Sequence, residues 1–272
     1  MIARIIFLVF CAMGMLNVQV QAQLFLEQAK VSLDVSGGDH PNGSLLIHNT
    51  SSAPVYIKVY WEDFEYSPPY DGSKNLLPAG TAPGSASQWV TFSPQTFSIP
   101  AFGQQNIDYT VSVPSQMQGG HYGVLFFEKS ISSEPLGHEE VTLVTRIGCL
   151  FFIEPKDKNK KAALQDISLK ANSITVSFVN QGNVILIPRT TYYIMREGGL
   201  VLLRGESKKL YVPPGATGTL EIPLKKKLNP GHYTLVVNSD LEEGDVVVKE
   251  IGLTVDTAGQ IFPVPCSAEG CK

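Results

Sequence analysis

The chain has 272 residues, of which 43% are hydrophobic and 17% are charged, an ordinary balance for a globular protein that buries a core. The formal net charge of −4 gives no reason to expect nucleic acid as a partner. The 24 Gly and 18 Pro residues punctuate short β-rich runs, and this pattern favours an all-β chain with many turns.

The N-terminus has the pattern of a secretory signal peptide. Arg4 precedes an apolar run over residues 5–16, and the small residues Val20 and Ala22 stand at the positions that a signal peptidase reads. We expect residues 1–22 to be removed and the mature chain to be exported. The alternative is a membrane anchor, but the run is shorter than the roughly 20 apolar residues of a spanning helix, and we expect no membrane span.

The first part of the mature chain consists of short runs with a period of two, separated by turn residues. Residues 65–88 are rich in Pro, Gly and Ser, and we interpret them as a loop-like insertion. The number and spacing of the strands favour an immunoglobulin-like β-sandwich. The predicted strands cover residues 28–35, 44–48, 55–64, 89–92, 96–99, 105–113 and 121–129.

Residues 139–155 have the clearest strand pattern in the sequence. Apolar residues alternate along it, and this period is typical of a β-strand. The run exceeds the usual strand length of about 5–6 residues and leads into a charged segment, so we interpret it as the last strand of a first domain. Its first half is apolar on one face only, as in an edge or half-exposed strand. The apolar face comprises Val141, Leu143, Ile147, Cys149, Phe151 and Ile153.

The second part of the chain repeats features of the first. A Pro–Gly turn opens a strand at residues 100–103 and again at residues 213–215, and Gly-His-Tyr occurs at residues 120–122 and 231–233. Asn49 and Asn180 each close a strand before a polar turn. We therefore predict two tandem immunoglobulin-like β-sandwich domains. Their predicted limits are residues 23–154 and 164–257, joined by a linker over residues 155–163 and followed by a tail over residues 258–272.

Tyr122 and Tyr233 occupy matching places in this repeat, just inside a late strand. Two interpretations stay open for both of them. Each is either a tyrosine corner, whose hydroxyl ties a loop back to the sheet, or an ordinary core aromatic.

The cysteines and histidines do not suggest catalysis. Cys149 lies in an apolar strand, where we expect a buried thiol, whereas Cys266 and Cys271 lie close enough to form a disulfide in an exported tail. Metal binding by that pair is a poor alternative, because no histidine is nearby. We expect no enzyme activity, no catalytic residue, no metal and no cofactor, since none of the histidines has a nucleophile or metal-ligand spacing around it. The histidines are His40, His48, His121, His138 and His232.

Several short motifs together resemble the periplasmic pilus chaperones of the PapD-like superfamily, over most of the mature chain. The matching segments are residues 31–34, 44–49, 54–57, 60–61, 92–94, 99–103, 114–128 and 141–155. The last of these, with Thr145-Arg146-Ile147, resembles that family's donor strand. The Cys266 and Cys271 pair is also similar to a disulfide found in some members.

This resemblance implies a function by donor-strand complementation. A pilus subunit is an incomplete sandwich, and the chaperone lends it an edge strand whose alternate side chains fill the open groove. The donor residues here would be Val141, Leu143, Thr145 and Ile147. The resemblance implies a protein partner, a pilus or surface-fibre subunit, and a periplasmic location, with the cell surface or exterior as second choice. The alternative for these residues is that they face the protein's own core.

The sequence departs from the family at the position that anchors the subunit's C-terminal carboxylate. The family uses an Arg in the first strand and a Lys in the donor strand, but here these positions fall on Gly37 and on Gly148 or Leu150. Arg146 is the nearest cation and our candidate carboxylate anchor. Other cations, without a spacing argument, are Lys30 and Arg189.

Two function classes therefore stay open. One is an exported assembly chaperone, and the other is a structural or adhesive module of the cell surface in which tandem sandwiches act as spacers. They differ at the strand over residues 139–155, because a chaperone must leave its edge available whereas a spacer would seal it.

Overall fold

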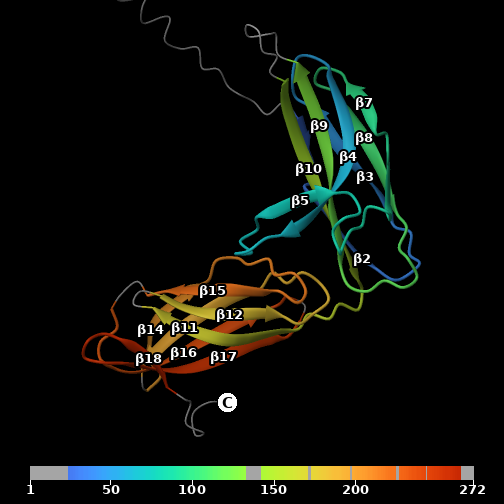
Figure 1. Ribbon diagram of the computed structural model, residues 1–272. Helices are drawn as coiled ribbons and strands as arrows, with labels where there is room; N and C mark the ends of the chain where they lie inside the picture. The colour runs from blue at the N-terminus through green and yellow to red at the C-terminus, as the bar shows by residue number, and fades with distance from the viewer. Residues whose placement is uncertain are drawn as a thin grey trace, which may run out of the picture.

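The computed structural model describes residues 24–132, 142–170, 173–196, 198–224, 227–242 and 244–264. In these ranges the chain forms strands β1 to β18 and no helix. Two β-sandwiches follow one another along the chain, and the second lies across the lower end of the first (Figure 1).

The first sandwich consists of two sheets. One has the strand order β1-β3-β8-β6, and the other has the order β2-β10-β9-β4-β5 with β7 paired to β4. The strands of the first sheet are β1 (Leu24–Leu26), β3 (Asn42–Asn49), β8 (Gln104–Val111) and β6 (Val90–Ser93). Those of the second are β2 (Lys30–Val35), β10 (Thr142–Pro155), β9 (His121–Ser132), β4 (Val55–Tyr66), β5 (Lys74–Pro78) and β7 (Thr96–Ile99).

The core of the first sandwich lies between these sheets, because alternate side chains of each strand point inward. Phe151 of β10 is fully buried, and its ring lies 5.4 Å from that of Trp61 and 5.1 Å from that of Tyr109, which belongs to the opposite sheet. Cys149 is a free, buried cysteine in the same core, so the prediction of a buried thiol is confirmed.

The second sandwich has the same plan. One sheet has the order β11-β12-β15, and the other has the order β14-β13-β16-β17-β18. Phe178, Ile174 and Leu186 are fully buried between them. The prediction of an all-β chain with two tandem immunoglobulin-like sandwiches is confirmed. The strands are β11 (Ala162–Lys170), β12 (Ser173–Asn180), β15 (Thr217–Pro223), β14 (Val201–Glu206), β13 (Arg189–Arg196), β16 (Gly231–Asp240), β17 (Val246–Val255) and β18 (Ile261–Val264).

The asparagines of the repeat have matching structural roles. Both are buried and end a strand. The Asn49 side-chain amide donates to the carbonyl of Pro100 at 2.9 Å, and that of Asn180 donates to the carbonyl of Val212 at 2.8 Å. Each also donates to the carbonyl four residues further on. The same turn thus occurs once in each sandwich, and in both a buried side-chain amide finds its hydrogen-bond acceptors among backbone carbonyls.

The two tyrosines of the repeat differ. The Tyr233 hydroxyl donates to the carbonyl of Asn229 at 2.6 Å, which is the bond of a tyrosine corner. The Tyr122 hydroxyl instead donates to Glu154 Oε1 at 3.2 Å and accepts from the Ile185 N–H at 2.9 Å. Tyr122 therefore joins the two sandwiches.

The prediction of a loop over residues 65–88 is wrong in part. Strand β4 continues to Tyr66 and forms an antiparallel hairpin with β5, which pairs Glu62 with Pro78 and Tyr66 with Lys74. Strand β1 was also not predicted. β5 is short and none of its side chains is buried, so it lacks the alternation that indicates a strand in the sequence. Its pairing with β4 stabilises it.

The remainder of the insertion is held by a buried carboxylate. Asp63 of β4 is 0% exposed, and its two oxygens accept hydrogen bonds from four donors. These are the Trp61 indole N–H at 3.1 Å, the Thr81 and Ala82 N–H groups at 2.9 and 3.1 Å, and the Ser85 hydroxyl at 2.8 Å. A chain segment about 20 residues from Asp63 in sequence is thereby tied to β4.

His121 holds the same segment from the other side. Its Nδ1 lies 3.0 Å from the Ser85 carbonyl, its ring centroid lies 3.9 Å from that of Trp89, and burial lowers its pKa. The folded state therefore favours neutral His121. This preference contributes fully to the free energy of unfolding above the unfolded pKa of about 6.5. The contribution should be lost as the pH falls through the lower pKa of the folded state. Urea unfolding at pH 7 and pH 5 should show a smaller decrease for His121→Gln than for the wild type. Equal decreases would contradict this role.

Candidate functional site

Strand β10 has two halves with different neighbours. Residues 150–153 pair with β2 on one side and with β9 on the other, and residues 154–155 pair with β2. Residues 142–149 pair with β9 only, and within the described ranges no strand covers their second side. Figure 1 shows β10 beside β9 at the outer side of the first sandwich. The first half of β10 therefore presents an open sheet edge.

The predicted donor residues fall on this half. Thr145 is exposed and pairs with Lys129, while Ile147 is half-buried against the first core. Leu143 lies on β10 opposite Ile131, with its side chain outside the described part, and Val141 lies outside the described residues. In the first half of β10, therefore, Val144, Thr145 and Arg146 are exposed and Ile147 packs partly against the core.

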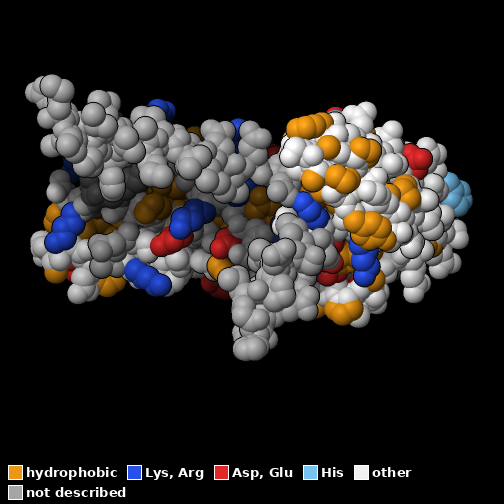
Figure 2. Space-filling model, turned by 90° about the horizontal axis from the view of Figure 1, so that it is seen from above, with side chains coloured by type: hydrophobic (Ala, Val, Ile, Leu, Met, Phe, Trp, Pro, Cys, Tyr) orange, Lys and Arg blue, Asp and Glu red, His pale blue; other side chains and the backbone are white. Residues whose placement is uncertain are grey.

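Several apolar side chains of the first sandwich are exposed. Val144 is 53% exposed, and Phe25 of β1 and Phe102 in the turn before β8 are also exposed. Figure 2, a view from above, shows hydrophobic side chains among basic ones at the end of the molecule that the first sandwich forms. Exposed apolar side chains that gather on one face are typical of a surface that binds another protein.

Arg146 lies on the outward face of the same half. Its Nη1 lies 3.1 Å from Glu62 Oε1 and donates to the Tyr60 hydroxyl at 3.3 Å, and its guanidinium stands 4.4 Å from the Phe126 ring centroid. The hydrogen bond with Tyr60, followed by the charge of Glu62, raises the pKa of Arg146. A chain-end carboxylate would have to compete with Glu62 for this cation.

The other two cations lie apart from it. Lys30 begins β2, and its ammonium stands 3.8 Å from the Phe152 ring centroid. Burial, the largest cause, lowers the pKa of Lys30. Arg189 lies in the second sandwich and pairs with Glu206 at 3.3 Å. The structure therefore brings Lys30, and not Arg189, to the paired end of β10.

Lys30 lines a polar cavity of about 320 Å³ between the sandwiches. Lys158, which also lines that cavity, forms ion pairs with Asp34 at 2.7 Å and with Glu154 at 3.2 Å. Among the described residues, Lys30 itself makes no ion pair. Lys30 is the first residue of its strand, and no spacing in the sequence indicated that it would line a cavity between the sandwiches.

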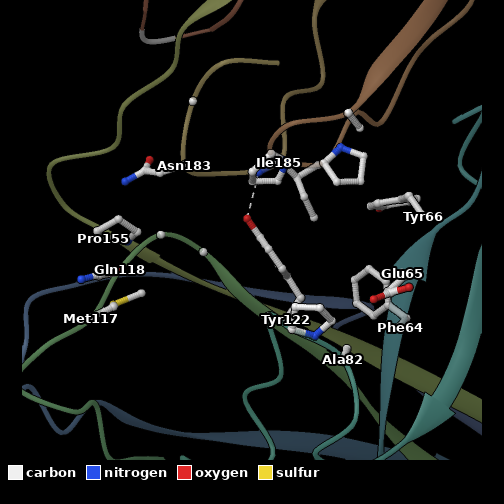
Figure 3. A pocket seen from close by; sticks show the side chains of 18 of the residues that line it. Phe64, Glu65, Tyr66, Ala82, Met117, Gln118, Tyr122, Pro155, Asn183 and Ile185 are labelled. Atoms are coloured by element: carbon white, nitrogen blue, oxygen red, sulfur yellow. Dashed lines mark hydrogen bonds between the residues drawn. The ribbon is translucent and has the colours of Figure 1, made fainter. Parts of the chain in front are cut away.

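A larger cavity of about 850 Å³ lies on the other side of the junction. Figure 3 shows Tyr122 reaching across it to Ile185, with Phe64 and Tyr66 of β4 on one wall and Asn183 on another. Within the part of the chain that the structure describes, no cluster of His, Cys, Asp or Glu is placed to hold a metal ion, and no helix is long and apolar enough to span a membrane.

No family model matches the sequence, and no curated protein matches it. Among solved structures, the class 5 fimbriae chaperone CfaA is similar at 14% identity over 84% of this chain and 98% of that chain, with a TM-score of 0.51. A chain from a chaperone–tip adhesin complex of CFA/I fimbriae biogenesis gives the same values. The chain therefore has the PapD-like chaperone fold, as the resemblance of its motifs implied.

Proposed function

We propose that this chain is a periplasmic, chaperone-like protein that holds pilus or other surface-fibre subunits by donor-strand complementation. The observation that supports this proposal best is the open edge of β10 over residues 142–149, next to a second half that is paired on both sides. A spacer module would gain from covering such an edge, because unpaired strands invite association.

Two contributions would stabilise the complex. A partner strand that pairs with the open edge gains about 0.5–1.5 kcal/mol net per hydrogen bond. Apolar donor side chains at Val141, Leu143 and Ile147 gain roughly 1.5–3 kcal/mol each when buried in a groove. Thr145 contributes less apolar area. The paired half of β10 fixes the direction of the donor half, so little conformational entropy is lost on binding.

The same proposal includes the signal peptide over residues 1–22 and a disulfide between Cys266 and Cys271, all of which lie outside the described residues. Arg146 stays the proposed carboxylate anchor. On binding it would break its ion pair with Glu62 and bind the C-terminal carboxylate of the subunit instead. Lys30 is the alternative anchor, because it lines a cavity between the sandwiches and forms no ion pair within the described chain.

The Leu143→Glu variant tests the donor strand. If this side chain enters a subunit's apolar groove, an unpaired carboxylate buried there should lower the affinity by more than about 100-fold. The thermal unfolding temperature should stay at the wild-type value, because the donor half is only partly packed. The measurement is the amount of fibre subunit that co-purifies from a periplasmic extract with the variant and with the wild type.

Leu202→Glu is the matched control, since Leu202 is an exposed leucine on the edge strand β14 of the second sandwich. It should leave subunit recovery unchanged. A collapse of the unfolding temperature in Leu143→Glu would instead show that Leu143 is a core residue and would favour the structural or adhesive module. Absence of any subunit bound to the wild type would contradict the chaperone function itself.

A further inference from the structure

The hairpin of β4 and β5 projects from the first sandwich toward the second (Figure 1). At its end, the ring of Tyr66 stacks on that of Tyr211 in the second sandwich, with centroids 4.9 Å apart and an interplanar angle of 23°. The Tyr211 N–H also donates to the carbonyl of Tyr70, in the hairpin turn, at 2.8 Å. A side-chain and a backbone contact thus join the hairpin to one residue of the other sandwich.

The stacked pair lies among cations and buried rings. Lys74 stands 4.9 Å from the Tyr66 ring centroid, and Lys209 stands 5.6 Å from the Tyr211 ring centroid, so each ring has an ammonium within cation–π distance. Tyr66 is buried, and this burial raises its pKa. Burial of a stacked pair stabilises a single relative placement of the two rings.

The hairpin turn is shaped to receive Tyr211. Gly72 has a φ of +107°, which favours glycine, and a Cβ atom at this position would lie 3.1 Å from the Tyr211 ring. A larger residue at position 72 would therefore meet both backbone strain and the ring. The close approach of the turn to Tyr211 depends on the absence of a side chain there.

A second group of contacts joins the sandwiches around Tyr122, at another point of the cavity that Tyr66 and Tyr122 both line. The Gly120 N–H donates to the Asn183 carbonyl at 2.9 Å, and the Ile185 N–H donates to the Tyr122 hydroxyl at 2.9 Å. Two bodies that touch at one small area can still rotate about it. The hairpin supplies a second contact at another point of the same cavity, and this second contact removes that rotation.

We infer that the hairpin of β4 and β5, acting through Tyr66, Tyr70, Gly72 and Tyr211, is a strap that fixes the angle between the two sandwiches, so that they move as one body. This inference goes beyond the proposed function and does not depend on it. It assigns a role to the hairpin part of the sequence insertion, whereas Ala86, further along the insertion, packs in the first core.

The test is backbone ¹⁵N relaxation on the full mature chain. In the wild type, both sandwiches should tumble with one rotational correlation time. In Tyr211→Ala, the correlation time of each sandwich should fall toward that of a body about half the size. Gly72→Val, which blocks the approach of the turn, should have the same effect. Tyr66→Phe keeps the stacked ring and should behave like the wild type.

Tyr193→Ala is the matched control, because Tyr193 is a half-buried tyrosine on β13 of the same sandwich, where it pairs with Arg204 of β14 and Val236 of β16. Unchanged amide shifts of both cores would show that the variants are folded. A single wild-type correlation time in both Tyr211→Ala and Gly72→Val would overturn the inference, and so would independent tumbling in the wild type. Leu143→Glu leaves the strap intact, so the two proposals fail separately.

Discussion

Replacing Asp63 with Ala is expected to lower the free energy of unfolding of the first sandwich by about 4 kcal/mol. The carboxylate is fully buried and accepts hydrogen bonds from Trp61, Thr81, Ala82 and Ser85. Removing it leaves the buried N–H groups of Trp61 and Ala82 without an acceptor, and each unsatisfied buried group costs about 1–3 kcal/mol. The segment that follows β5 should also lose its attachment to β4.

The measurement is urea unfolding followed by tryptophan fluorescence, since Trp61 and Trp89 lie in this region. Asp108→Ala is the control, because Asp108 is an exposed aspartate on β8, and the change should stay within about 0.5 kcal/mol. Asp63→Asn keeps the shape but turns one acceptor into a donor, so an intermediate loss is expected. A cost below about 1 kcal/mol for Asp63→Ala would show that water replaces the carboxylate.

The second large effect is expected for Phe151→Ala. Phe151 is fully buried and contacts aromatic rings of both sheets, Trp61 of β4 and Tyr109 of β8. Truncation of a buried Phe removes apolar contacts and leaves a cavity, at a cost of about 3–5 kcal/mol. Differential scanning calorimetry should show a lower unfolding temperature for the first sandwich and an unchanged one for the second.

Val144→Ala on the same strand is the matched comparison. Val144 is 53% exposed in the open half of β10, so its truncation should change the unfolding free energy by less than about 0.5 kcal/mol. The contrast would demonstrate that one half of β10 belongs to the core and the other is free for a partner. If both variants were destabilised equally, the open edge would be part of the protein's own core.

Local patterns in the sequence were enough to predict the class of fold. The period of two in β4, β8 and β10 reflects the alternation of side chains between the core and the other face of a sheet, and this is a property of each strand by itself. The repeated asparagine turns predicted the duplication, because each closes its own loop through bonds to nearby carbonyls. The burial of Cys149 followed from its place among alternating apolar residues.

The tertiary structure alone decided which groups far apart in the chain meet. Arg146 pairs with Glu62, 84 residues away, and Tyr122 reaches Ile185, 63 residues away. No local sequence pattern indicates such a partner, because the contact depends on the register of two strands or on the docking of two domains. For the same reason the strand β5 and the stack of Tyr66 on Tyr211 could not be predicted, since pairing across the fold, rather than strand propensity, stabilises them.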